Sequence, residues 1–67
     1  MQEQVLKALE DLEEMRDIHA AWAETFESNP EMEKEYVATG EWDTAEKHRD
    51  YVNKYINIIN LVKLLQT

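Results

Sequence analysis

An apolar stretch with helical spacing is the feature that most constrains how this chain folds. Within Tyr51–Leu65, ten of the fifteen residues are apolar, and the polar ones recur mostly three or four positions apart, at Asn53, Lys54, Asn57, Asn60 and Lys63. That period is typical of a helix and not of a half-buried strand. The apolar residues cover half of the circumference and more, whereas a surface helix needs a stripe only somewhat wider than about 100°. We therefore predict that this helix contacts two neighbours.

A first long helix is predicted over about residues 2–27, a segment of good helix formers without Gly or Pro. Its apolar and aromatic residues alternate at steps of three and four. They define one seam, made of Val5, Ala8, Leu12, Met15, His19, Trp22 and Phe26. Acidic residues recur every seven positions and point away from this seam, at Glu3, Glu10, Asp17 and Glu24.

Turn-forming residues end this helix at Asn29 and Pro30. Pro30 disfavours the helical conformation at Asn29, while Asn is a strong N-cap and Pro is favoured at the first helical position. A short second helix is therefore predicted over about residues 30–39. Gly40 is the only glycine, and we expect it just after this helix in a left-handed conformation.

A third helix is predicted over about residues 44–66, with Asp43 as its N-cap and Glu46 at the third helical position of a capping box. Its seam toward the first helix consists of Ala45, His48, Val52, Tyr55, Ile59 and Val62. The expected fold is all-α. It is a small helical bundle in one domain, residues 1–67, in which the two long helices are antiparallel.

A chain of 67 residues has a core that supplies little net stability, rarely more than roughly 3–5 kcal/mol. Disulfides cannot compensate because the chain contains no cysteine. Apolar residues remain in excess near the end of the third helix, where Leu61, Leu64 and Leu65 lie beside Val5 and Leu6. We therefore predict that self-association into a homodimer completes the bundle at this end.

The charge of the chain is distributed unevenly. The net charge of −8 divides into −11 for residues 1–46 and +3 for residues 47–67. Such a field repels nucleic acid, so the favoured partner is another protein, including a basic protein that itself binds nucleic acid. No stretch resembles a signal peptide or provides the about 20 apolar residues that cross a bilayer. We expect no membrane association and a cytoplasmic location.

The two histidines, His19 and His48, lie on the inward seams of the long helices. If the chain reverses direction near residue 34, the two side chains are nearly level and approach each other. A metal-binding bundle is therefore one alternative function, although the Glu-x-x-His pairs of di-iron bundles and the H-E-x-x-H zinc motif are absent. We favour semi-buried histidines hydrogen-bonded to Tyr, Asn or carboxylate groups, and assign no metal ligand.

The acidic residues Glu10, Asp17 and Glu24 face outward along a rod of roughly 36 Å. Small inhibitors that mimic DNA, including phage-borne ones, display carboxylates in this way. A rigid row of negative charge competes for a basic cleft by the same electrostatics as phosphate. A simple solvated helix face shows the same pattern. A DNA-mimic inhibitor is therefore the main alternative function.

Trp42 stands in the connection between the second and third helices. We expect it to form an aromatic plug with Trp22, Phe26 and Tyr36. The alternative is that Trp42 is exposed and acts as a binding hot spot, since Trp and Tyr dominate interface energetics.

Nothing in the sequence indicates catalysis. There is no cysteine, only one serine and only one glycine, and a bundle this small has little room for a substrate pocket. We therefore predict no enzyme and no cofactor, but a small acidic helical protein that binds another protein as a regulator, adaptor or inhibitor. The residues assigned to partner binding are Glu10, Asp17, Glu24, Trp42, Ile58, Leu61, Leu64 and Leu65.

Overall fold

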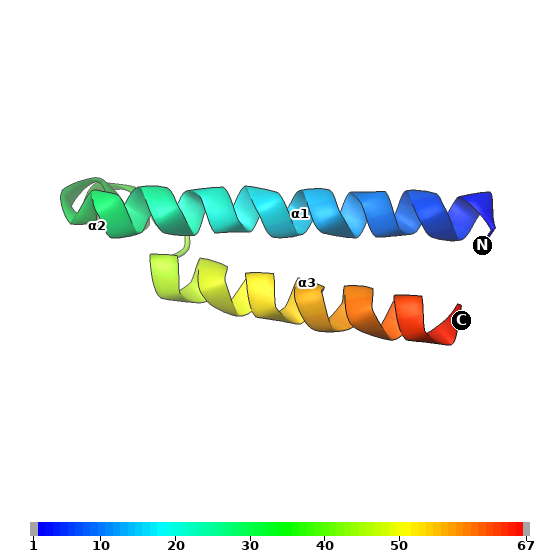
Figure 1. Ribbon diagram of the computed structural model, residues 1–67. Helices are drawn as coiled ribbons and strands as arrows, with labels where there is room; N and C mark the ends of the chain where they lie inside the picture. The colour runs from blue at the N-terminus through cyan, green and yellow to red at the C-terminus, as the bar shows by residue number, and fades with distance from the viewer. Residues whose placement is uncertain (1, 67) are drawn as a thin grey trace.

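The computed structural model describes residues 2–66, which form an all-helical hairpin. α1 spans Glu3–Ser28, α2 spans Pro30–Ala38 and α3 spans Ala45–Leu65, so each bound lies within one residue of the prediction. Figure 1 shows α1 and α3 side by side in opposite directions, with α2 at the end where the chain turns. The molecule measures 44 × 18 × 16 Å. The all-α antiparallel prediction is confirmed, whereas self-association stays a prediction.

A single residue, Asn29, joins α1 to α2. It leaves the helical conformation, with φ −139° and ψ 79°, because Pro30 disfavours that conformation in the preceding residue. Asn29 Oδ1 accepts a hydrogen bond from the Met32 backbone N–H at 3.2 Å, so Asn29 is the N-cap of α2 as predicted. The Asn29 N–H still donates to the carbonyl groups of Thr25 and Phe26. These bonds hold α2 against the end of α1.

α2 ends where the sequence predicts. Gly40 follows the C-cap residue Thr39 and has a φ of 81°, the left-handed conformation that glycine adopts without strain. Its N–H donates to the Val37 carbonyl at 3.0 Å, and the Thr39 hydroxyl donates to the Tyr36 carbonyl at 2.7 Å. The last carbonyl groups of α2 are thus satisfied, and the chain turns toward α3.

The N-terminus of α3 corrects one prediction. Thr44 is the N-cap, and its hydroxyl accepts a hydrogen bond from the Lys47 backbone N–H at 3.2 Å. The predicted capping box with Asp43 as N-cap and Glu46 at the third position is therefore wrong. Asp43 lies one position earlier and forms an ion pair with Lys47 Nζ at 3.9 Å.

The cause of this difference is a tertiary hydrogen bond between α2 and α3. Glu33 Oε2 accepts from the backbone N–H of Ala45 at 2.7 Å. Negative charge at a helix N-terminus is favourable, and this bond satisfies the N–H of the first helical residue. Because Glu33 is twelve residues away, a capping rule that uses only neighbouring residues does not predict it.

α1 packs on α3 through a stripe that is rotated from the predicted seam. Leu9, Ala23 and Phe26 are buried, whereas Ala8 and Met15 of the predicted seam are exposed. Ala23 has a small side chain that lets the two backbones come close, and Leu9 lies two heptads before it on the same stripe. Contact with a single long neighbour therefore selects this stripe and leaves Ala8 and Met15 at the surface.

On α3, by contrast, the predicted seam is confirmed. Its residues are buried or half-buried, and they are Ala45, His48, Val52, Tyr55, Ile59 and Val62. Ile59 retains only 3% of its accessible surface, the lowest value on this helix. The remaining Ile and Leu residues of α3 are each at least 37% exposed.

Candidate functional site

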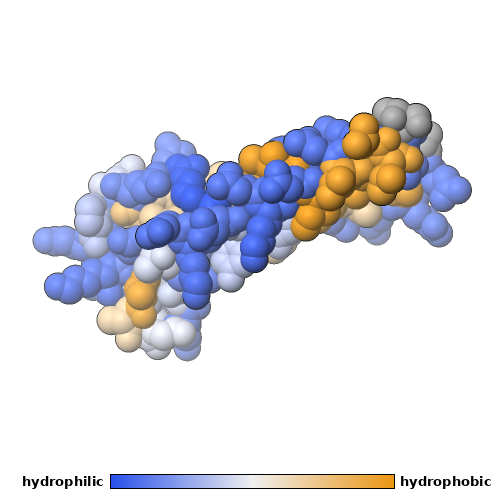
Figure 2. Space-filling model, turned by 90° about the horizontal axis from the view of Figure 1, so that it is seen from below, coloured by the Kyte–Doolittle hydropathy of each residue, from blue (hydrophilic) through white to orange (hydrophobic). Residues whose placement is uncertain are grey.

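Large apolar side chains remain on the surface at the end of the hairpin that α2 does not cover. The exposed fractions are 43% for Ile58, 58% for Leu61, 68% for Leu64, 77% for Leu65 and 47% for Leu6 of α1. We call these five residues the terminal apolar surface. Figure 2 shows hydrophobic surface gathered at this end, while most of the remaining face is hydrophilic. The α3 residues predicted to bind a partner are therefore exposed.

Part of this surface belongs to a row of residues on α3 that lies beside the buried seam and begins near the middle of the hairpin. Ile58 and Leu65 follow Tyr51 at intervals of seven residues and therefore lie on the same side of α3. The Tyr51 ring packs against the His19 ring of α1, with 4.8 Å between centroids. This contact places the row along the edge of the groove between α1 and α3.

A matching row on α1 was only partly predicted. Ala8 and Met15 precede Trp22 at intervals of seven residues, and Ile18 lies one turn before Trp22. Met15 is 40% exposed and Ile18 is 43% exposed. Sequence reasoning assigned Met15 to the buried seam. The spacing of seven was present in the sequence, but only the packing shows which of two adjacent rows faces α3.

An ion pair between α1 and α3 marks the opposite edge of this contact. Arg49 donates to both carboxylate oxygens of Glu27, at 2.7 and 3.2 Å. This pairing lowers the pKa of Glu27 and raises the pKa of Arg49. On α3, Arg49 and Tyr51 are two residues apart and therefore about 200° apart around the helix axis. On α1, Glu27 and Trp22 are five residues apart and therefore about 140° apart. The Trp22 and Tyr51 rows therefore share the other side of the hairpin.

His19 and His48 meet between the two long helices. Their Nδ1 atoms are 2.8 Å apart, a hydrogen-bonding distance at which one ring donates and the other accepts. The pair therefore carries at most one positive charge. The predicted approach of the histidines is confirmed, but each ring is the hydrogen-bond partner of the other, in place of a Tyr, Asn or carboxylate group.

His48 is 5% exposed, and its Nε2 atom is buried without a hydrogen-bond partner among residues 2–66. Burial lowers the pKa of His48 below its ordinary value, the neighbouring His19 lowers it further, and Asp43 opposes these effects. A protonated ring would present a buried N–H without an acceptor, which is costly. These effects favour the neutral form of His48.

The histidine pair is not joined by further side chains that could complete a metal site among residues 2–66. No group of three or more His, Cys, Asp or Glu side chains placed to hold a metal ion occurs within residues 2–66. The two Nδ1 atoms that face each other already share a hydrogen bond. The described residues therefore give no support to the metal-binding alternative.

Trp42 belongs to the predicted aromatic plug and also reaches the surface. Its ring lies 4.5 Å from that of Trp22 and 5.4 Å from that of Tyr36, measured between centroids. Phe26 completes the cluster, with its ring 5.8 Å from Tyr36. Trp42 is nevertheless 36% exposed. It lies at the α2 end of the molecule, far along the hairpin from the terminal apolar surface.

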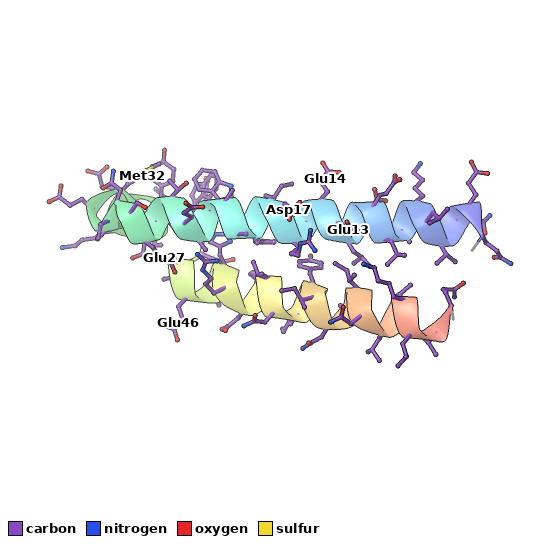
Figure 3. The ribbon with its side chains drawn as sticks, viewed as in Figure 1. Glu13, Glu14, Asp17, Glu27, Met32 and Glu46 are labelled. Carbon is purple, nitrogen blue, oxygen red and sulfur yellow. The ribbon has the colours of Figure 1, made fainter. Side chains whose placement is uncertain are left out.

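The acidic residues assigned to partner binding occupy a third location. Glu10, Asp17 and Glu24 are all exposed on α1. Asp17 accepts a hydrogen bond from Arg16 Nε at 3.0 Å, so a cation lies beside the middle carboxylate. Figure 3 shows the neighbouring Glu14 pointing away from α3. Negative charge thus covers the outer face of α1. The exposed apolar residues of α3 lie in a different part of the molecule.

The predicted partner-binding residues therefore lie in three separate places and not in one site. No protein-family model matches the chain, and neither a curated protein nor a solved structure gives a match. Within residues 2–66, no helix combines the length and apolar character that crossing a membrane requires.

Proposed function

We propose that this chain is a small acidic helical protein that binds another protein through the terminal apolar surface. The observation that carries the proposal is the exposure of Ile58, Leu61 and Leu65, at 43%, 58% and 77%. Single apolar residues at a surface are normal, but a contiguous group of large ones marks an interaction site. The chain would act as a regulator, adaptor or inhibitor of its partner, without catalysis of its own.

The size of the apolar contribution constrains the kind of contact. Full burial of one Leu or Ile side chain stabilises by about 1.5–3 kcal/mol, so the remaining exposed parts of Ile58, Leu61 and Leu65 supply roughly 3–5 kcal/mol. Association costs an estimated 4–15 kcal/mol or more. These side chains are therefore anchors, and the partner must contact additional surface of the hairpin.

The acidic charge of α1 adds selectivity to this proposal. Residues 1–46 carry a net charge of −11, which attracts a basic protein and raises its rate of association. The partner class that fits is a basic protein, including one that binds nucleic acid. A cytoplasmic location is part of the proposal, because a chain without cysteine suits a reducing compartment.

The test is capture of host proteins on immobilised wild-type chain, compared with Leu61→Asp and Leu65→Asp. We expect each substitution to reduce the captured partner by roughly tenfold or more, because it places a charge in the apolar contact. Asn57→Asp is the matched control, since it adds the same charge at an exposed position of the same helix. Equal capture by the leucine variants and by wild type would refute the proposal.

A second candidate function is occupation of a nucleic-acid-binding cleft by the outer face of α1. The exposure of Glu10, Asp17 and Glu24 along one helix supports it. A triple charge reversal of these residues to Lys should then abolish partner binding, while Leu61→Asp leaves it intact. Glu46→Lys is the control, because Glu46 is exposed on α3 and points away from α1 (Figure 3). The reverse pattern of losses would favour the apolar surface.

A further inference from the structure

We infer that a second copy of this chain packs against the side of the hairpin that carries the Trp22 and Tyr51 rows, so that each α1 lies beside the α3 of the other copy in a four-helix bundle. We call this side the side face, and its large apolar residues are Met15, Ile18, Trp22, Tyr51, Ile58 and Leu65. The inference goes beyond the proposed function, because the second copy covers Ile58 and Leu65, whereas Leu61 lies farther around α3 and stays open to a different, basic partner.

The dimensions of the side face suit a dimer. The face runs from Lys47 to Leu65 on α3, about 27 Å at the helical rise, across a molecule 18 Å wide, which gives roughly 500 Å² per copy and about the 1,000 Å² in total that a specific interface needs. Apolar side chains are spread along this length, since Met15 and Ile18 are 40% and 43% exposed and Leu65 is 77% exposed. The contact therefore extends well beyond Ile58 and Leu65 at the end of α3.

The histidine pair sets which residues of α1 and α3 are level. Because His19 lies opposite His48 and the helices are antiparallel, residues whose numbers sum to about 67 share a level along the axis. Met15 is then level with residue 52, and Ile18 with residue 49. An open hollow lies on α3 at these levels, lined by Lys47, Asp50, Tyr51, Asn53 and Lys54. In the dimer, Met15 and Ile18 of one copy occupy the hollow of the other.

The side face carries both an acidic and a basic residue, and these face each other when two copies of the side face meet. Asp11 lies one turn before Met15 on α1, and Lys54 lies one turn before Ile58 on α3. Lys54 is level with residue 13, so it lies within two residues of Asp11 along the axis, about 3 Å at the helical rise. When α1 of one copy lies beside α3 of the other, each Asp11 faces a Lys54. An isologous interface requires this kind of self-complementarity.

The direction of the symmetry axis follows from the same positions. A two-fold axis parallel to the helices keeps the apolar ends together and places α1 beside the α3 of the second copy. A two-fold axis across the helices would place α1 beside α1 and α3 beside α3, so that Asp11 of one copy would no longer face Lys54 of the other. The parallel axis is therefore the arrangement that the charges and apolar groups both satisfy.

The test is sedimentation equilibrium on the purified chain over micromolar to submillimolar concentrations, with a charge exchange across the interface. We expect wild type to reach twice the 8.0 kDa mass of one chain. Asp11→Lys alone and Lys54→Asp alone should each weaken dimerisation by roughly tenfold, because each places like charges opposite one another. The double variant should recover the wild-type constant. Glu14→Lys changes the net charge as Asp11→Lys does at a position that points away from α3 (Figure 3), and it should leave dimerisation unaffected.

Each result decides the inference. A wild-type chain that stays at 8.0 kDa over the whole range overturns it, as does a dimer that neither single reversal weakens. Failure of this inference is distinguishable from failure of the proposed function. A monomeric chain whose capture of a host protein is still lost in Leu61→Asp refutes the second copy and supports the terminal apolar surface. Circular dichroism of every variant shows that the helices remain folded.

Discussion

The two ends of the hairpin both bury a seam between α1 and α3, with Ile59 only 3% exposed near the open end, but they differ in how far their other apolar residues are covered. At the α2 end, Phe26 retains 1% of its accessible surface and His48 retains 5%. At the other end, Leu61 and Leu65 retain 58% and 77%. The difference is the third wall that α2 and Trp42 provide at one end alone. Two packed helices cover one stripe of each other, and a wider apolar surface needs a further element.

The largest expected loss of stability comes from a substitution at the α2 end. Phe26→Ala removes the most deeply buried aromatic ring, which costs about 3–5 kcal/mol in cores. A chain of this size has roughly that much net stability, so we expect the variant to be mostly unfolded. Leu61→Ala is the matched substitution at the exposed end, where surface changes are usually within about 0.5 kcal/mol. Urea denaturation followed by circular dichroism measures both, and similar losses would contradict the contrast between the two ends.

The next largest effect concerns the hydrogen bond that fixes the start of α3. Glu33→Ala removes the acceptor of the Ala45 N–H and the negative charge near the helix N-terminus, so we expect a loss of about 1–2 kcal/mol. Glu35→Ala removes an exposed carboxylate from the same helix and serves as the control. The measurement is again the free energy of unfolding. An equal effect of the two substitutions would mean that the bond to Ala45 contributes nothing.

The histidine pair predicts that stability falls on mild acidification. The pKa of His48 in the folded chain lies below its ordinary value of 6.5, so the unfolded chain binds more protons as the pH drops through this region. Unfolding then takes up a proton, and the folded state loses stability progressively from about pH 6.5 down through the lowered pKa of His48. The groups that face this ring are His19, Phe26, Tyr51 and Asp43.

Thermal melts between pH 8 and pH 5 test this expectation. His48→Leu should remove most of the pH dependence in that range, whatever its effect on absolute stability. The lowered pKa of Glu27 acts only at more acidic pH, because its ordinary value is 4.5 and its stabilising contribution is lost below that value. An unchanged pH dependence in His48→Leu would assign the effect to other groups.

The smallest expected effect is on the ion pair between α1 and α3. Arg49→Gln removes the contact with Glu27, and we expect a slight fall in melting temperature at low salt that disappears at high salt. Both side chains are nearly half exposed, at 45% and 49%, so the pair is well screened. Arg49→Lys keeps the charge but not the two-point contact. If it melts like Arg49→Gln, the geometry of the pair matters more than its charge.

Much of the fold followed from local patterns. The Asn29–Pro30 junction, the left-handed Gly40 and the α3 seam all stand where the sequence predicts them. The N-cap of α3 did not, because Glu33 fixes Ala45 from another helix. The seam of α1 was predicted correctly at Val5, Leu12, His19, Trp22 and Phe26. It was wrong at Ala8 and Met15, because spacing alone does not choose between the adjacent apolar residues Ala8 and Leu9.

The candidate site divides in the same way. The sequence by itself determined the three helices, their direction and the excess of apolar residues at Ile58, Leu61 and Leu65, because periodicity and capping are local properties. Only the tertiary structure decided that His19 and His48 bond to each other and that Met15 and Ile18 remain exposed. Those outcomes depend on the rotation of α1 against α3, which is set by the contacts between the two helices and not by either pattern alone.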